Sequence, residues 1–198
     1  KIVPYYQQKD LVESAVNTVS NALIQGIVLV VLVIIAFMRA IRPSLVVAGV
    51  LPFAVLFAYL AMAPLKLSAN LMTLGGLVIA LGMLVDGAIV VVENVDRMLS
   101  RASGKQNMAR VVADACREVV RPITFAILIV VVVFLPLFTL GGVEGKTFRP
   151  LAYTIALAMV GALIYTVLIT PKFASLVMRP PKASKRAEQK EGLLLRFY

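Results

Sequence analysis

The chain has 198 residues, of which 61% are hydrophobic, and its mean hydropathy is +0.94. Because the apolar residues stand in long blocks, this composition excludes a soluble globular domain and indicates an integral membrane protein. The formal net charge of +10 would suit a nucleic-acid binder, but the positions of the basic residues, given below, indicate membrane orientation instead.

Five apolar blocks predict five spanning helices, each near the ~20 residues that are needed to cross ~30 Å of hydrocarbon. In chain order they are residues 22–38, 45–63, 71–92, 123–138 and 151–170. The predicted fold is therefore all-α, a polytopic transmembrane helix bundle.

Three further segments flank this bundle, which we place at residues 22–178. Residues 1–21 have apolar side chains at helical spacing, which predicts the end of a periplasmic segment followed by an interfacial helix. A polar stretch between the third and fourth spans predicts a cytoplasmic surface helix at about residues 103–120. Residues 179–198 read as a charged cytoplasmic linker and the start of another amphipathic helix.

The basic residues are distributed unevenly between the two sides of the predicted membrane. If the first span runs inward, fifteen of the 20 lysines and arginines fall on one side. This bias makes that side cytoplasmic. The chain opens on Lys1 without a signal-peptide pattern, and we expect it to be a fragment of a longer protein.

Asp86 is the single charge in residues 71–92, and a charge in hydrocarbon costs several kcal/mol unless the fold uses it. Glu93 lies seven residues later, within roughly 20° of the same helical face. With Gly75, Gly82 and Arg97 these carboxylates form a stripe at spacings of 7, 4, 7 and 4. Small residues let another helix approach closely, so the stripe predicts either an ion or proton pathway or a packing seam whose polar group a neighbour satisfies.

Other residues offer few alternatives for cofactor chemistry. The sequence has one cysteine, Cys116, and no histidine, so a disulfide framework and imidazole ligands are excluded. Residues 141–147 resemble a phosphate-binding loop, but position 140 is leucine instead of the required glycine, so we expect an external turn and no direct use of ATP. We expect no cofactor.

Methionine thioethers suit monovalent copper or silver. Met72 and Met83 lie on the same predicted helix as Asp86 and are candidate metal ligands. The alternative is that they fill gaps in the helix packing.

Residues 77–97, with Val-Asp-Gly-Ala at 85–88 and Glu-Asn at 93–94, resemble the fourth membrane helix of the resistance-nodulation-division (RND) efflux pumps. Supporting motifs follow through most of the chain: Arg-x-x-Arg-Pro at 39–43, Arg-Pro at 121–122, Pro136 before Gly-Gly at 141–142, and Thr-Pro at 170–171. The chain then resembles helices two to six of about twelve.

The resemblance implies that Asp86 carries a proton and that Glu93 belongs to the same relay, supported by Asn94, Gly82, Gly87 and Arg97. Asp86 would bind a proton from the periplasmic side, let its helix shift and release the proton inward. Glu93 either hands the proton on or pairs with Arg97 at i,i+4 as an anchor.

The resemblance also bears on the cargo. Drug-exporting members usually have two adjacent aspartates, whereas position 87 is glycine; Asp-Gly-Ala, together with residues 142–146, is more similar to the heavy-metal branch. Divalent-metal members often carry an aspartate six residues before the central one. Ala80 in that place counts against zinc, cobalt or cadmium and leaves copper or silver open.

The function expected from this resemblance is proton-driven export of heavy-metal cations by a secondary active transporter, not an enzyme, in the bacterial inner membrane. Its expected partners are lipid, protons, the metal cation, a second transmembrane half, and a homotrimer with a periplasmic adaptor and an outer-membrane channel, without nucleic acid. The alternatives are export of organic drugs or other hydrophobic compounds, and a non-transporting membrane scaffold.

Overall fold

The computed structural model describes residues 8–38, 40–102 and 107–178, with the side chains of residues 8–11 excepted. The described chain forms helices without strands. They are α1 (Gln8–Met38), α2 (Ile41–Ala48), α3 (Val50–Met62), α4 (Leu71–Leu84), α5 (Asp86–Arg101), α6 (Met108–Thr139), α7 (Gly142–Ile164), the π-helix η1 (Tyr165–Ile169) and α8 (Thr170–Val177).

Five stretches of this chain are long and apolar enough to cross a membrane. They correspond to α1, to α2 with α3, to α4 with α5, to α6, and to α7 with η1 and α8. The prediction of an all-α bundle with five spanning helices is confirmed.

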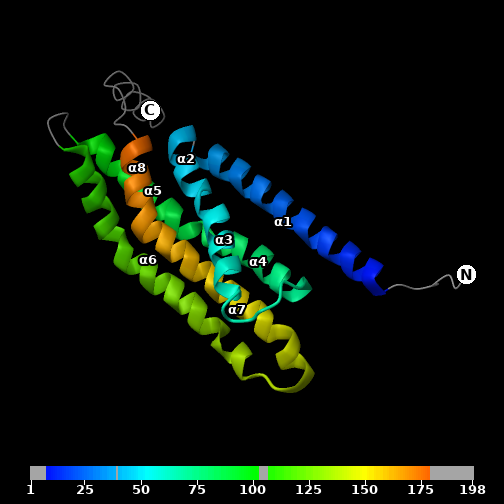
Figure 1. Ribbon diagram of the computed structural model, residues 1–198. Coiled ribbons are helices and arrows are strands. Elements are labelled where there is room, and N and C mark those ends of the chain that lie inside the picture. Colours follow the sequence, from blue (N-terminus) through cyan, green and yellow to red (C-terminus); the bar gives the residue numbers. More distant parts are fainter. Residues whose placement is uncertain (1–7, 39, 103–106, 179–198) are drawn as a thin grey trace, which may run out of the picture.

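The helices form a bundle with α6 along one edge, α1 along the opposite edge, and α3, α4 and α7 between them (Figure 1). The core lies where α4 packs against α7, and its side chains Leu77, Ala80, Ile155 and Ala158 are fully buried. Their small and medium size allows the helix axes to come close. This core holds α4 and its continuation α5 in place.

Two glycines allow neighbouring helices to approach α7 closely. A Cβ atom on Gly76 would lie 2.8 Å from the carbonyl oxygen of Leu151, and one on Gly161 would lie 2.9 Å from the Cβ of Phe57. Any larger residue would push α4 or α3 away from α7. The close packing of α4 and α3 on α7 therefore requires glycine at positions 76 and 161.

The last span contains a π-helical turn at residues 165–169, beside the break between α2 and α3 at Gly49. The Tyr165 hydroxyl donates a hydrogen bond to the carbonyl oxygen of Val46 over 3.1 Å. A Cβ on Gly49 would collide with that hydroxyl. The π-helical turn thus places the buried Tyr165 side chain against the break between α2 and α3.

Helix ends differ from the expected ones in several places. The last span begins at Gly142, so residues 142–147, where we expected an external turn, form the first turns of α7, and the Gly145 N–H donates to the carbonyl oxygen of Gly141. Helix α1 runs from Gln8 through the predicted interfacial segment into the first span. Helix α6 begins at Met108 and runs without a break into the fourth span, in place of the separate surface helix expected at about 103–120. Residues 108–121 contain neither glycine nor proline, so nothing ends the helix there. Predictions about residues 1–7, 103–106 and 179–198 fall outside the described residues.

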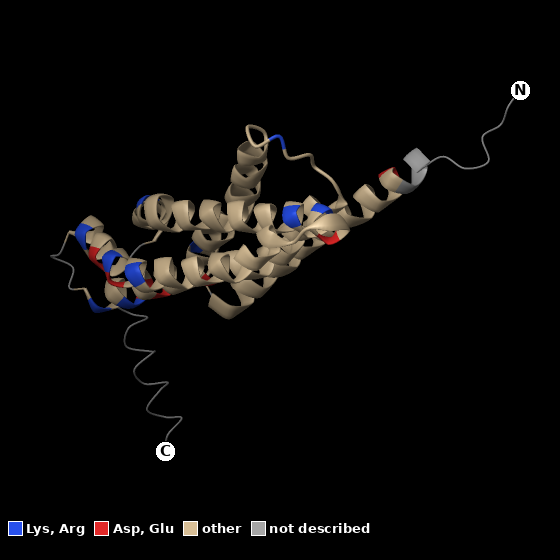
Figure 2. Cartoon of the chain, turned by 90° about the horizontal axis from the view of Figure 1, so that it is seen from below, with Lys and Arg blue, Asp and Glu red and all other residues tan. Residues whose placement is uncertain are grey.

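The charges divide as the positive-inside bias predicts. Most basic residues of the described chain gather at one end of the bundle, where α5 ends and α6 begins, which we call the basic end (Figure 2). They are Arg42, Arg97, Arg101, Arg110, Arg117 and Lys172, whereas Arg121 lies 13 residues, about 20 Å, beyond the start of α6.

Candidate functional site

The third span is interrupted next to its central carboxylate. Helix α4 ends at Leu84, Val85 forms a bend, and Asp86 is the first residue of α5. Val85 keeps helical dihedral angles (φ −86°, ψ −27°), so α5 continues the span started by α4. Asp86 lies halfway along the span from Leu71 to Arg101.

Asp86 stands at a pocket of about 330 Å³ between α5 and α6. Its walls are mostly apolar, and Asp86 is the one ionisable side chain among the described residues that line it; the others are Met83, Gly87, Val90, Pro122, Ile123, Ala126, Ile127, Val130 and Met159. The side chain of Asp86 is exposed in the described chain. A proton that binds here would change the charge of an otherwise apolar cavity.

The structure gives a steric reason for glycine at position 87, which the sequence alone did not show. A Cβ at this position would lie 3.0 Å from Cγ2 of Ile123 on α6. A second aspartate next to Asp86 would therefore require Ile123 to move. The close packing of α5 on α6 at Gly87 thus favours a single carboxylate, Asp86, at this place in the span.

The stripe predicted from the spacing lies on one face of α4 and α5. No atom of another described helix lies within 4 Å of the places where Gly75 and Gly82 would carry a Cβ. Asp86, Glu93 and Arg97 are also exposed, with Asp86 and Arg97 beside α6. The described helices leave this face uncovered.

A polar cluster at the basic end joins α5 to α6. The Asn94 side chain is buried, and its Nδ2 donates to the carbonyl oxygen of Ala115 (2.8 Å) and to Oε2 of Glu118 (2.9 Å). Arg97 donates to Oδ1 of Asn94 and lies 3.5 Å from Oε2 of Glu118. We call Asn94, Arg97 and Glu118 the α5–α6 brace.

The ion pair of the α5–α6 brace tests one of the two roles expected of Glu93, the anchor formed with Arg97. Among the described residues, Arg97 forms its ion pair with Glu118, so the expected Glu93–Arg97 anchor is not the pairing that the structure has. Glu118 was missed in the sequence, where the only signal was an acidic pair, Asp114 and Glu118, in a segment rich in arginine.

The two candidate metal-ligating methionines lie apart. Met83 lines the Asp86 pocket together with Met159, whereas Met72 lies in the first turn of α4. Eleven residues of helix separate Met72 from Met83, about 16 Å, so they do not share one ion. In the part of the chain that the structure describes, no three His, Cys, Asp or Glu side chains gather as a metal site.

The fold and the site define a class: polytopic helical membrane proteins with a single carboxylate at the middle of a span. The model of the AcrB/AcrD/AcrF family matches residues 1–198, and the chain belongs to this family. The resemblance to RND pumps is thereby confirmed.

Individual relatives agree on the branch. The chain is 39% identical over 202 residues to the cobalt-zinc-cadmium resistance protein CzcA of Cupriavidus metallidurans, covering 98% of this chain and 18% of that protein. It is 32% identical over 209 residues to the cation efflux system protein CusA of Escherichia coli K12, covering 100% of this chain and 20% of that protein. The crystal structure of a heavy metal efflux pump (crystal form I) superposes with a TM-score of 0.77 at 36% identity, covering 89% of this chain and 17% of that one. The chain thus spans about a fifth of the length of its relatives.

Proposed function

We propose that the full protein is a proton-motive-force-driven efflux transporter that exports heavy-metal cations in exchange for protons. It would act as a secondary active transporter and not as an enzyme. The observation that carries the proposal is the placement of Asp86, halfway along a span and alone among the ionisable residues of an apolar pocket. The names of CzcA and of the superposed pump support the cargo class.

Protonation of Asp86 would remove the one charge of its pocket, and this changes what the uncovered face can pack against. A charged carboxylate facing lipid is costly, so a polar or protein surface must cover it in the ionised state. We infer that the second transmembrane half supplies this surface along Gly75 and Gly82. Each proton that enters at ~100 mV delivers ~2.3 kcal/mol from the electrical term alone.

We propose Glu93 as the next proton-carrying group. It lies about 10 Å farther along the helix than Asp86, toward the basic end. Because Arg97 pairs with Glu118, the carboxylate of Glu93 is not held by that arginine. Asn94 and Arg97 support the relay by fixing α5 against α6.

The cargo is proposed as a class, a heavy-metal cation. The printed name of CzcA points to divalent cobalt, zinc and cadmium. Ala80 points the other way, since it is fully buried between helices and places no carboxylate ligand one and a half turns before Asp86. Met83 and Met159 at the Asp86 pocket would suit a soft monovalent ion.

The same family membership supports a proposal for location and partners. We propose the bacterial inner membrane, with the basic end in the cytoplasm, and a homotrimer that works with a periplasmic adaptor and an outer-membrane channel. The rival functions are export of organic drugs by the same fold and a scaffold in which Asp86 serves only helix packing.

The test is Asp86→Asn in the full protein encoded by the gene, compared with Glu144→Gln, an exposed carboxylate at the opposite end of the bundle. Everted vesicles report proton-gradient-dependent uptake of copper, silver, zinc, cobalt, cadmium and organic drugs. We expect Asp86→Asn to abolish metal transport with near-normal expression, and Glu144→Gln to keep it. Transport by Asp86→Asn at more than about half the parental rate would remove Asp86 from the mechanism, and gradient-independent behaviour of the parent would favour the scaffold.

A further inference from the structure

The π-helical turn of the last span contains two buried hydroxyl groups without a hydrogen-bond partner. Thr166 lies in η1 and Thr170 begins α8, four residues later, so the two side chains share one face. They are 1% and 0% exposed, and neither Oγ1 has a partner among the described residues. A buried hydroxyl without a partner is unfavourable. Because the described helices enclose both oxygens, a partner has to come from the helix itself.

Another threonine of the same span shows what a regular helix provides. Thr154 on α7 is equally buried, and its Oγ1 donates to the carbonyl oxygen of Pro150, four residues earlier, over 2.7 Å. Thr124 on α6 makes the corresponding bond over 2.8 Å. An α-helix therefore offers a threonine hydroxyl the carbonyl oxygen at i−4. Thr166 and Thr170 lack this bond at the place where the span is a π-helix.

The backbone of η1 also leaves a carbonyl oxygen without its helical donor. In an α-helix the Thr170 N–H would bond to the carbonyl oxygen of Thr166, but it bonds to that of Tyr165 instead. A π-helix would give the Thr166 carbonyl a donor at residue 171, which is proline and has no N–H. A return of η1 to α-helix would restore the bond from Thr170 to Thr166 and bring an i−4 carbonyl oxygen near each hydroxyl.

One tertiary contact holds the first residue of the π-helical turn. The Tyr165 hydroxyl donates to the carbonyl oxygen of Val46 over 3.1 Å, and the ring centroids of Tyr165 and Phe53 lie 5.4 Å apart. Gly49, at the break between α2 and α3, leaves room for the hydroxyl. We call the hydrogen bond between Tyr165 and Val46 the Tyr165 contact. It ties η1 to the irregular part of a neighbouring span.

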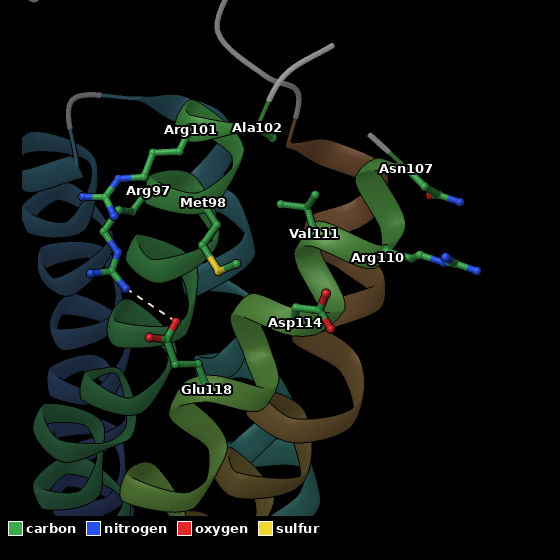
Figure 3. Close-up of a pocket in the computed structure, with 9 residues that line it drawn as sticks. All are labelled: Arg97, Met98, Arg101, Ala102, Asn107, Arg110, Val111, Asp114 and Glu118. Carbon is green, nitrogen blue, oxygen red and sulfur yellow. Dashed lines mark hydrogen bonds and ion pairs between the residues drawn. The ribbon is translucent and has the colours of Figure 1, made fainter. Parts of the chain in front are cut away.

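The turn separates a helix at the Asp86 pocket from a helix at the basic end. Met159 of α7 lines the Asp86 pocket before the turn. After the turn, α8 packs against α2, α5 and α6 (Figure 1), and Arg97 and Glu118 pair between α5 and α6 (Figure 3). A π-helical turn takes up about one extra residue, so its return to α-helix rotates the following helix and advances it by about 1.5 Å. A change in η1 therefore moves α8 relative to the Asp86 pocket.

We propose that η1 is a conformational switch between a π-helical and an α-helical form. In the described form, the Tyr165 contact holds the turn, and the hydroxyls of Thr166 and Thr170 are unpaired. In the second form, Tyr165 leaves Val46, and the two hydroxyls donate to the carbonyl oxygens of Ala162 and Thr166. One hydrogen bond is lost and others are gained, so two arrangements of the same span compete. The use of this movement in transport rests on the proposed function, whereas the switch is a property of the span.

The experiment measures the position of α8 in the full, purified protein by electron paramagnetic resonance. Native cysteines are replaced by serine, and spin labels are attached at Leu176 on α8 and Leu29 on α1, which are 66% and 62% exposed. Because α8 does not pack against α1, a rotation of α8 changes the distance between the labels. We expect two distances in the parent, one for each form of η1.

The variants change the balance between the two forms in opposite directions. Tyr165→Phe removes the Tyr165 contact and should raise the ratio of the second form to the described form about fivefold, the equivalent of one hydrogen bond. Thr166→Val with Thr170→Val removes the hydroxyl bonds of the second form and should lower that ratio at least as much. Replacing both threonines by serine keeps the hydroxyls and should restore the parental ratio. Thr154→Val is the matched control, since its hydroxyl is paired in both forms, and it should leave the ratio unchanged.

Three results would overturn the switch. The first is a single distance that no variant changes. The second is a shift in the same direction in Tyr165→Phe and in the double valine variant. The third is a double valine variant that unfolds at a lower temperature than the parent, as Thr154→Val should, because the two hydroxyls would then be paired in the described form. Metal transport is measured separately: two distances that respond as expected in a protein without transport would support the switch and refute the proposed function.

Discussion

Two glycines on the same helix, Gly76 and Gly82, should respond in opposite ways to substitution, because they lie on different faces of α4. Gly76 faces α7, where a Cβ would lie 2.8 Å from the carbonyl oxygen of Leu151 and 3.2 Å from the Cβ of Thr154. Gly82 faces the uncovered side, with no atom of another described helix within 4 Å of its Cβ position. We expect Gly76→Ala to damage this bundle itself and Gly82→Leu to damage what packs against it.

The expected magnitudes follow from these distances. A contact of 2.8 Å to a backbone oxygen cannot be relieved by a rotamer change, so α4 must move from α7, at a cost of about 1–3 kcal/mol for overpacking. At Gly82, by contrast, replacing glycine within a helix favours the helical state by about 0.5–1 kcal/mol. Within the described helices, Gly82 substitution should therefore be neutral or stabilising. Any loss must come from the covering segment.

The assay compares Gly76→Ala, Gly82→Ala and Gly82→Leu in the full protein by membrane insertion, thermal unfolding in detergent and metal transport. Gly76→Ala should lower the unfolding temperature. Gly82→Leu should insert normally and lose transport, and Gly82→Ala should fall between Gly82→Leu and the parent. If Gly82→Leu inserts, assembles and transports at the parental rate, the stripe faces lipid, and the inward-facing placement of Asp86 has to be abandoned.

Five further variants test other contacts. Asn94→Ala should cost about 1–3 kcal/mol, since it removes the buried amide that donates to the carbonyl oxygen of Ala115, and unchanged thermal unfolding would refute the brace. Glu93→Gln should reduce transport without lowering stability, whereas Arg97→Ala should lower stability through the brace; equal stability defects in both would restore the anchor role of Glu93. Gly49→Ala should destabilise more than Tyr165→Phe, whose lost hydrogen bond costs about 1 kcal/mol, and the reverse order in unfolding measurements would contradict the packing at the π-helix.

The spans could be predicted from the sequence because an apolar block of about 20 residues has few other uses. The ends of the helices could not be predicted. Hydropathy locates the segment that crosses the hydrocarbon, but it does not show where the backbone hydrogen bonds of the helix end. Helix α6 begins at Met108, well before its apolar block, since an uninterrupted helix continues to satisfy its own backbone in water. Caps are encoded at Asn70, whose side chain accepts from the N–H groups of Met72 and Thr73, and at Asn107, whose side chain accepts from the N–H of Ala109. Only Asn70 lies at the edge of an apolar block, so only there did the expected start, residue 71, coincide with the observed one.

The candidate site likewise has parts that could be predicted from the sequence and parts that could not. Asp86 stood out because it is the single charge of its block, a property of the sequence alone. The partnership of Asn94 with Glu118 could not be predicted, because 24 residues separate them and the sequence does not show which faces of α5 and α6 meet. The reason for glycine at position 87 likewise required the position of Ile123.

The two ends of α5 are held very differently, and this difference suits a proton-driven movement. At the basic end, the buried amide of Asn94 binds both a carbonyl oxygen and a carboxylate of α6, so α5 and the start of α6 should move as one body. At the other end, Val85 interrupts the helix and Asp86 faces an open apolar pocket. A change of charge at Asp86 acts next to this bend and this pocket. We therefore expect the displacement to occur at the α4–α5 bend and along the uncovered stripe, with the α5–α6 pair as the rigid part that carries it to the cytoplasmic end.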